Sequence, residues 1–428
     1  MTAVTKLPSH AEADQSSQQS EDITPKDIEC PDGGLLAWFQ VASSFFLLFN
    51  SWGIINTFGV YQTYYETNLL HNHSPSSISW IGSIQPFLLL IVGVISGPLY
   101  DMGFFRSLVA VGTILIVLSF MLTSLCETYW QVILAQSIFV GVGAGCLFIP
   151  AVAVVPRYFL RRRAVATGIV TSGSSLGGTL YPIIFQQLEP RIGFPWTNRV
   201  LGFITLATCT FSLVVIRPLG KPSERRSLLE PPAFRERTYQ IYCVAMFFGY
   251  VAFFGPVFYL QSYALTHGLS DGTLALYLVA ILNAASIAGR IVPPYFAPKI
   301  GAINIMFFSC ASAGVITMCW IAVRSAAGNV AFAVAYGFSS GGIIAMPTVV
   351  LASLMQDIGL LGTRMGMSSV LNAFASLCGA PIVGAILKGS AGDYLGVQLF
   401  CGLSMLVTAG IWFALRWTQS GPKLLANV

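Results

Sequence analysis

The distribution of charged residues constrains this chain more than any other feature. A helix that crosses a lipid bilayer needs about 20 consecutive, mostly apolar residues. Twelve intervals of roughly this length or longer contain no Asp, Glu, Lys or Arg: 33–65, 67–100, 107–126, 128–156, 164–188, 200–216, 238–270, 272–289, 300–323, 325–356, 365–387 and 394–415. Only helices satisfy their own backbone hydrogen bonds in lipid, and the short alternating segments of a membrane barrel are absent. We therefore expect an all-α membrane protein with twelve transmembrane helices.

Composition supports the membrane and argues against other classes. Charged residues make up 9% of the chain, where soluble domains have about 25%. The net charge is +5, but the basic residues lie between apolar blocks and not together on one soluble face. We therefore expect no nucleic-acid partner. The nine Cys lack CxxC spacing and fall mostly in apolar blocks, which predicts neither a metal site nor a cofactor. The lipid bilayer is the partner that the sequence predicts, and the oligomeric state stays open.

The positions of Lys and Arg predict the orientation. If the N-terminus is cytoplasmic, seventeen of the 22 basic residues lie on the cytoplasmic side and four lie outside. Cytoplasmic loops carry such an excess, so both termini are predicted to be cytoplasmic. Asn72 would then lie outside in a glycosylation sequon, Asn-His-Ser. We expect the plasma membrane, with the vacuolar membrane as the alternative.

The most polar interior stretch, 217–238, separates six intervals from six and has the Pro-rich, basic composition of a surface linker. Two halves of six helices are the plan of major facilitator transporters. The predicted organisation is a disordered cytoplasmic tail, a first half, a cytoplasmic linker, a second half and a cytoplasmic tail, at 1–34, 35–216, 217–238, 239–416 and 417–428.

Two short motifs carry a family resemblance. The first consists of Asp32, Gly33 and Gly34, followed by Trp38 before the first span. The second runs from the fourth span into the fifth and reads RYFLRRRAVATG over 157–168. Both resemble signatures of the monocarboxylate porter family of the major facilitator superfamily, and their spacing resembles its fungal members. The resemblance implies a carrier that moves a small organic acid by alternating access. It also implies an alternative, export of a secondary metabolite.

Other features near these motifs suggest gating residues. Arg161, Arg162 and Arg163 either anchor a cytoplasmic loop or take part in a gate, and both interpretations stay open. The loop after the second span, GPLYDMGFFR, resembles the superfamily's Gly-x3-Asp motif. That resemblance implies that Asp101 and Arg106 latch the inward gate.

Arg290 is the one basic residue inside a predicted span. An intramembrane charge is costly and indicates a functional site, although snorkelling to the interface is the alternative. Asn283 and Ser286 share its helical face at spacings of seven and four residues. Because Arg pairs with carboxylates, this face suits an anionic substrate.

The family's lactate carriers have an Asp and a Lys that here correspond to Ser286 and Asn56. Their proton relay is therefore not expected, and uniport is an open possibility. Further polar residues could line a central cavity or bond between helices. These are Asn50, Asn56, Thr57, Tyr61, Gln85, Tyr181, Tyr250 and Asn372, and the aromatic Phe254 could line the cavity with them. The chain has no Walker A motif and no His or Asp cluster, so we expect a transporter rather than a pump or an enzyme.

Overall fold

The computed structural model describes residues 32–159, 162–217, 219, 229–268, 272–355, 360–390 and 392–421. This described part is helical and contains no strand. Almost all of the tail predicted over 1–34, Arg161, positions 218 and 220–228 of the linker and positions 422–428 of the last tail lie outside it. The helices of the first half are α1 (Leu35–Asn50), α2 (Trp52–Asn56), α3 (Phe58–Tyr64), the π-helix η1 (Tyr65–Leu69), α4 (Pro75–Asp101), α5 (Phe105–Thr123), α6 (Tyr129–Val132), the π-helix η2 (Ile133–Ile138), α7 (Phe139–Ala153), the 3-10 helix η3 (Val155–Arg157) and α8 (Arg163–Val215).

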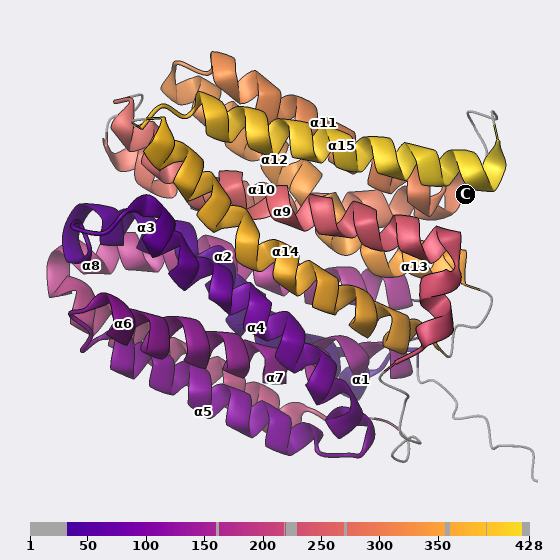
Figure 1. The fold of residues 1–428 in the computed structure, drawn as a ribbon. Helices are drawn as coiled ribbons and strands as arrows, with labels where there is room; N and C mark the ends of the chain where they lie inside the picture. Colours follow the sequence, from indigo (N-terminus) through magenta and orange to yellow (C-terminus); the bar gives the residue numbers. More distant parts are fainter. Residues whose placement is uncertain are drawn as a thin grey trace, which may run out of the picture.

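The second half is helical in the same way. Its helices are the 3-10 helix η4 (Pro231–Arg235), α9 (Arg237–Thr266), α10 (Gly272–Ile300), α11 (Ala302–Cys319), the 3-10 helix η5 (Trp320–Ala322), α12 (Ala326–Ala345), α13 (Pro347–Leu354), α14 (Leu361–Gly389) and α15 (Leu395–Ser420). In Figure 1 the two halves lie one above the other, with α4 and α14 side by side between them.

Twelve crossings result, as predicted. Eleven helices among the described residues are long and apolar enough to span a membrane. One of them, α8, is two spans, because its backbone leaves helical geometry at Gly193, where φ is +76°. The chain doubles back there, so that the hydroxyls of Tyr181 and Thr205 lie 2.9 Å apart. In a straight helix, 24 residues would separate them by about 36 Å. The expected all-α membrane fold is confirmed.

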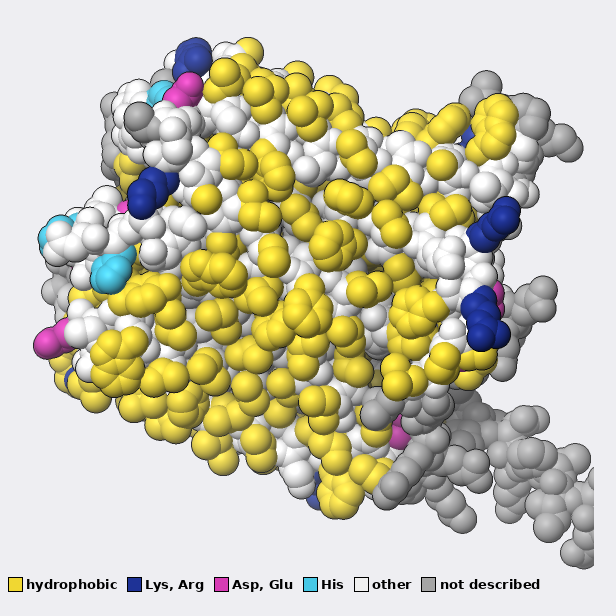
Figure 2. All heavy atoms as spheres, viewed as in Figure 1, with side chains coloured by type: hydrophobic (Ala, Val, Ile, Leu, Met, Phe, Trp, Pro, Cys, Tyr) yellow, Lys and Arg dark blue, Asp and Glu magenta, His cyan; other side chains and the backbone are white. Residues whose placement is uncertain are grey.

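Two ends and an apolar band define the molecule. We call the end where α1 begins and α15 finishes the near end, and the opposite end, with Leu69, Gly193 and Thr266, the far end (Figure 1). Figure 2 shows charged side chains gathered at these ends and a wide band of apolar side chains between them. Exposed residues of this kind include Ile114, Phe203, Phe308 and Leu403. Such a band suits the hydrocarbon core of a bilayer.

Three helix pairs make most of the contact between the halves. The helix α4 packs on α14, and α8 packs on α10, whereas α3 packs on α9 toward the far end. Small residues permit close approach there. A Cβ added to Gly59 of α3 would lie 2.7 Å from the carbonyl oxygen of Val257 on α9. The helices α7 and α12 add no comparable pair between the halves among the described residues.

Candidate functional site

Arg290 lies within the interface between the halves. The sequence interval ended before it, but α10 continues through Pro293, Pro294 and Pro298 to Ile300. Arg290 therefore lies in the interior of the α10 sequence, ten residues before its last residue. Its side chain is buried, with 3% of the residue exposed. It donates across the interface to the carbonyl oxygen of Thr171 at 3.1 Å and to the hydroxyl of Ser174, both on α8.

The rest of the Arg290 environment is uncharged. Within its own helix, Nε donates to the Ser286 hydroxyl at 3.4 Å. Tyr250 of α9 lies close enough to interact electrostatically. No carboxylate of the described residues pairs with Arg290. A buried guanidinium that has only neutral partners retains its positive charge for an anionic ligand, with which it forms strong charge-assisted hydrogen bonds.

Two other predicted residues meet further along the same interface. Asn283 of α10 and Asn56 of α2 both lie against Gly178 of α8. A Cβ added to Gly178 would lie 2.6 Å from the Asn283 amide oxygen and 3.0 Å from the Asn56 Cβ. The structure therefore brings Asn56, Asn283, Ser286 and Arg290 onto one seam, where span 1 and span 5 of the first half meet span 8 of the second.

An enclosed cavity lies beside this seam. Its volume is about 20 Å³, and it is lined by Trp52, Tyr250, Phe253, Phe254, Ile343 and Ile344. A cavity of this size holds about one water. Tyr250 connects it with Arg290, so an aromatic, apolar space adjoins the cation. An organic ligand would fit only after the helices around this cavity move apart.

The structure places the other predicted residues elsewhere. Tyr61 donates to Asn198 at 2.7 Å inside the first half, among Tyr65, Phe185 and Phe194. Asn372 lies on α14, where its amide nitrogen donates to Ser368 at 3.4 Å and its buried amide oxygen has no partner. The structure does not bring either residue to Arg290.

Four further residues predicted to line the cavity have hydrogen-bond partners other than Arg290. Tyr181 donates to Asn50 at 2.6 Å within the first half, and Asn50 donates to Thr208 at 2.8 Å. Thr57 and Gln85 donate to backbone carbonyls of their own helices. The contacts of Asn50 and Tyr181 are bonds between helices, as in the alternative interpretation of the sequence, whereas those of Thr57 and Gln85 lie within one helix.

The family follows from a comparison of the whole chain with known proteins. Residues 41–359 match the family model of the Major Facilitator Superfamily. The chain belongs to the major facilitator superfamily. Its fold is thus that of a transporter with two six-helix halves, and the seam around Arg290 lies between the halves, where transporters of this architecture bind their substrates.

Similar proteins cover nearly all of this transporter. An MFS-type transporter of Emericella nidulans is 42% identical over 89% of this chain and 86% of its own length. The aspyridones efflux protein of the same organism is 40% identical, over 89% of this chain and 78% of its own length. The agnestins efflux protein of Paecilomyces divaricatus is 35% identical, over 94% and 90%.

The two sequence motifs of this transporter meet at the near end. The backbone N–H of Asp32 donates to the carbonyl oxygen of Tyr158 at 3.0 Å, and the Trp38 ring packs edge-on against Phe159 at 5.2 Å. Gly33 and Gly34 have φ of +156° and +86°, which permits a sharp entry of the chain into α1. The contacts join residues more than 120 positions apart in sequence, so they could not be predicted from spacing.

The predicted gate residues have different surroundings. Asp101 is buried and lies 3.9 Å from Arg157, which follows α7. Arg106 is exposed and lies over the Phe105 ring at 5.8 Å. Arg162 is also exposed, and its backbone N–H donates to Asp32 Oδ1 at 3.5 Å, whereas Arg163 begins α8. The basic partner of Asp101 therefore comes from another span and not from its own loop.

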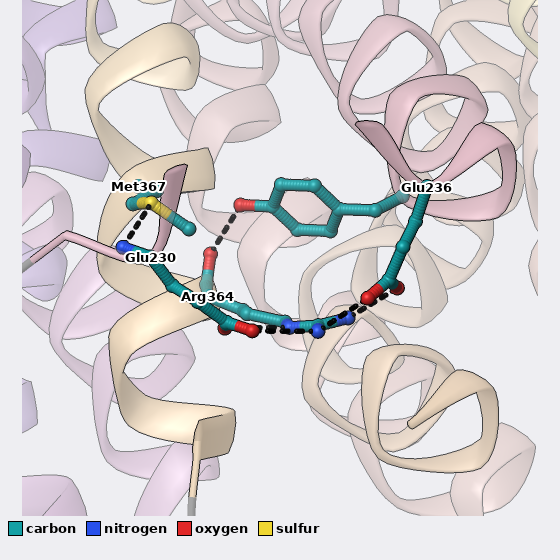
Figure 3. Close-up of polar contacts among 5 residues, drawn as sticks. Glu230, Glu236, Arg364 and Met367 are labelled. Carbon is teal, nitrogen blue, oxygen red and sulfur yellow. Dashed lines mark hydrogen bonds and ion pairs between the residues drawn. The ribbon is translucent and has the colours of Figure 1, made fainter. Parts of the chain in front are cut away.

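Sequence reasoning missed the strongest ion cluster of the described chain. Arg364 of α14 binds Glu230 through Nε and Nη2, each at 2.9 Å, and binds Glu236 through Nη1 and Nη2 at 2.6 and 2.7 Å (Figure 3). Its carbonyl oxygen accepts from Tyr239, and Met367 accepts from the Glu230 backbone. The hydrogen bonds from Arg364 lower the pKa of the Glu230 carboxyl. We call these four residues, Glu230, Glu236, Arg364 and Tyr239, the linker clasp.

The predicted glycosylation residue lies in an exposed turn at the far end. Asn72 is exposed between η1 and α4. The hydroxyl of Ser74, the third residue of the sequon, accepts from the Ser77 backbone and caps α4.

Proposed function

We propose that this transporter exports an organic metabolite with an acidic group, larger than lactate, from the cytoplasm. The observation that carries the proposal is Arg290, a buried cation with neutral partners beside an aromatic cavity. The cation would hold the acidic group, and Trp52, Tyr250 and Phe254 would contact an apolar body. Asn56, Asn283 and Ser286 would complete the site as the halves separate.

Export is favoured over uptake of a small acid by two observations. Relatives that align over most of this chain are efflux proteins for aspyridones and for agnestins. In addition, Ser286 and Asn56 stand where the lactate carriers have an Asp and a Lys. The second candidate, a monocarboxylate porter for a small acid, is supported by the motifs around Asp32 and Arg157.

The orientation belongs to the same proposal. With the near end in the cytoplasm, both termini and the linker over 217–238 are cytoplasmic, and the far end with Asn72 faces outside as a glycosylated turn. The plasma membrane is the compartment that suits export. The boundaries at 34, 216, 238 and 416 then separate tails, halves and linker.

The test is transport in sealed vesicles of both orientations that contain the purified protein. The probes are lactate and aspyridones, each followed with and without a pH gradient. Saturable accumulation of aspyridones in inside-out vesicles, with no lactate flux, is the expected result. Saturable lactate flux without flux of the larger probe would replace export with the monocarboxylate assignment.

A further inference from the structure

Hydroxyl groups join the two halves at the far end. Across the interface, Ser79 of α4 hydrogen-bonds to Tyr259 of α9, and Ser76 donates to the carbonyl oxygen of Pro381 on α14 at 3.0 Å. The hydroxyls of Thr63 and Ser262 lie 3.3 Å apart. We call this set of contacts the far seam. It has to separate whenever the transporter opens at this end.

One ionisable side chain belongs to the far seam. Glu66 of η1 accepts from Ser262 of the second half at 2.8 Å through Oε2. Its other oxygen lies 2.6 Å from the amide nitrogen of Gln62 in the first half. Glu66 is thus the carboxylate, among the described residues, that bonds directly to both halves.

The surroundings of Glu66 contain no compensating charge among the described residues. Tyr259 of α9 and Tyr394, before α15, face it closely enough to interact electrostatically, and both are neutral phenols. The packed segments of α3, α4 and α14 present Thr63, Ser76, Ser79 and Pro381, which do not ionise near neutral pH. No described Lys, Arg or His pairs with the Glu66 carboxylate.

The geometry also accommodates a protonated Glu66. Its contact with Gln62 at 2.6 Å is short for N–H···O and within the usual range for O–H···O. The two ends of an amide have nearly the same shape, and the Gln62 amide oxygen is buried without a partner. After an amide rotation, a protonated Glu66 could donate to that oxygen and still accept from Ser262.

We propose that Glu66 makes opening of the far seam dependent on pH. Closing the seam withdraws water from the carboxylate and supplies no cation. This loss of water outweighs the two neutral donors, which by themselves favour the ionised form, so the closed seam favours the protonated form. Opening returns the group to water and favours the ionised form. Acid therefore shifts the equilibrium toward a closed far seam, and a rise in pH shifts it toward opening.

The proposal rests on the proposed function only for the side of the membrane that the far end faces. There, acidity outside the cell would favour the return of an empty exporter to its inward-facing state. The test below needs neither a substrate nor a membrane orientation. Its failure would therefore leave the export proposal standing, and a failure of export would leave the pH dependence of the seam standing.

Ser83 provides a reporter for opening. It lies one helical turn from Ser79 on the same face of α4, it is fully buried, and its hydroxyl has no partner. A Ser83→Cys variant in detergent is treated with a maleimide from about pH 5 to pH 8, and modification at position 83 is followed by peptide mass spectrometry. The same variant with Glu66→Gln corrects for ionisation of the thiol itself.

The measured quantity is the labelling rate of Ser83→Cys divided by the labelling rate of Ser83→Cys with Glu66→Gln. It is expected to rise about threefold or more from acid to alkaline pH, because one pKa unit of coupling corresponds to a tenfold change. Glu127 is an exposed carboxylate at the same end. Glu127→Gln should therefore leave the pH profile of Ser83→Cys labelling unchanged. If Glu66→Gln misfolds, Glu66→Asp keeps the charge and should keep the pH dependence. A ratio that does not change with pH would overturn the proposal.

Discussion

The near and far ends of the molecule are held together in different ways. At the far end, the hydrogen bonds of Glu66, Ser79 and Tyr259 run between the two halves. At the near end, the described ion pairs lie within one half or its linker, as Asp101 with Arg157 and Arg364 with Glu230 show. The described polar contacts of the far end thus cross the interface, whereas the described ion pairs of the near end do not.

This difference separates moving contacts from permanent ones. Alternating access opens one end at a time, so the contacts of the far seam must break in every cycle. The linker clasp and the Asp101 pair can persist, because they do not cross between the halves. We expect substitutions at the near end to change stability first and substitutions at the far seam to change the opening equilibrium first.

The largest expected effect on stability is that of Arg364→Ala. It removes four charge-assisted hydrogen bonds and leaves Glu230 and Glu236 unpaired. Hydrogen bonds to charged groups contribute about 1.5–3 kcal/mol, and partial exposure of Glu236 places the loss near the lower figure. Thermal unfolding in detergent measures it, with Arg106→Ala as an exposed control. An unchanged unfolding temperature would contradict a structural role for the clasp.

A smaller effect is expected from Ser262→Ala. It removes a bond across the far seam without leaving a cavity, so the unfolding temperature should change little. Labelling of Ser83→Cys should increase about threefold, since a neutral hydrogen bond contributes roughly 0.5–1.5 kcal/mol. A lower unfolding temperature without any change in the labelling rate would contradict the distinction between moving contacts at the far end and permanent contacts at the near end.

Acid should weaken the linker clasp. Because Arg364 lowers the pKa of Glu230, this carboxyl contributes stability above its ordinary pKa, and the contribution is lost as pH falls through the lowered value. The difference in unfolding temperature between wild type and Glu230→Gln should therefore be present at neutral pH and shrink in acid. A difference that persists unchanged at the lowest accessible pH would argue against this pairing.

The smallest effects distinguish the two predicted gate residues. Asp101→Asn weakens a long, 3.9 Å pair with the partly exposed Arg157, and it should slow transport modestly. Arg106→Gln should leave transport and stability nearly unchanged, because the side chain is exposed. The measurement is the initial transport rate. A larger decrease in this rate for Arg106→Gln than for Asp101→Asn would support the interpretation that Arg106 latches the gate, as the loop motif implied.

The sequence predicted the twelve spans because each depends on local composition. It also indicated that Arg290 is special, since a charge within an apolar block is visible without any structure. It could not predict the contact of Glu66 with Ser262 or of Arg364 with Glu230. These pairs join residues more than 130 positions apart, and helix packing alone brings them together.

Local patterns also misplaced some boundaries. The eighth charge-free interval ends at 289, whereas α10 continues eleven residues further, through Arg290 to Ile300. Arg364 lies just outside the interval 365–387 for the same reason, although α14 begins at Leu361. A charged residue ends a charge-free interval by definition. A helix can continue past such a residue where hydrogen-bond acceptors of a neighbouring helix or a carboxylate bind the charged group, as for Arg290 and Arg364.

The central claim is that Arg290 holds the acidic group of the exported metabolite. The most direct test compares wild type, Arg290→Lys and Arg290→Ala for saturable accumulation, in inside-out vesicles, of the organic acid that the wild type transports. We predict that Arg290→Ala loses at least about tenfold in transport, as loss of a charge-assisted bond of about 1.5–3 kcal/mol implies, and that Arg290→Lys retains part of it. Transport by folded Arg290→Ala at the wild-type rate would contradict the claim.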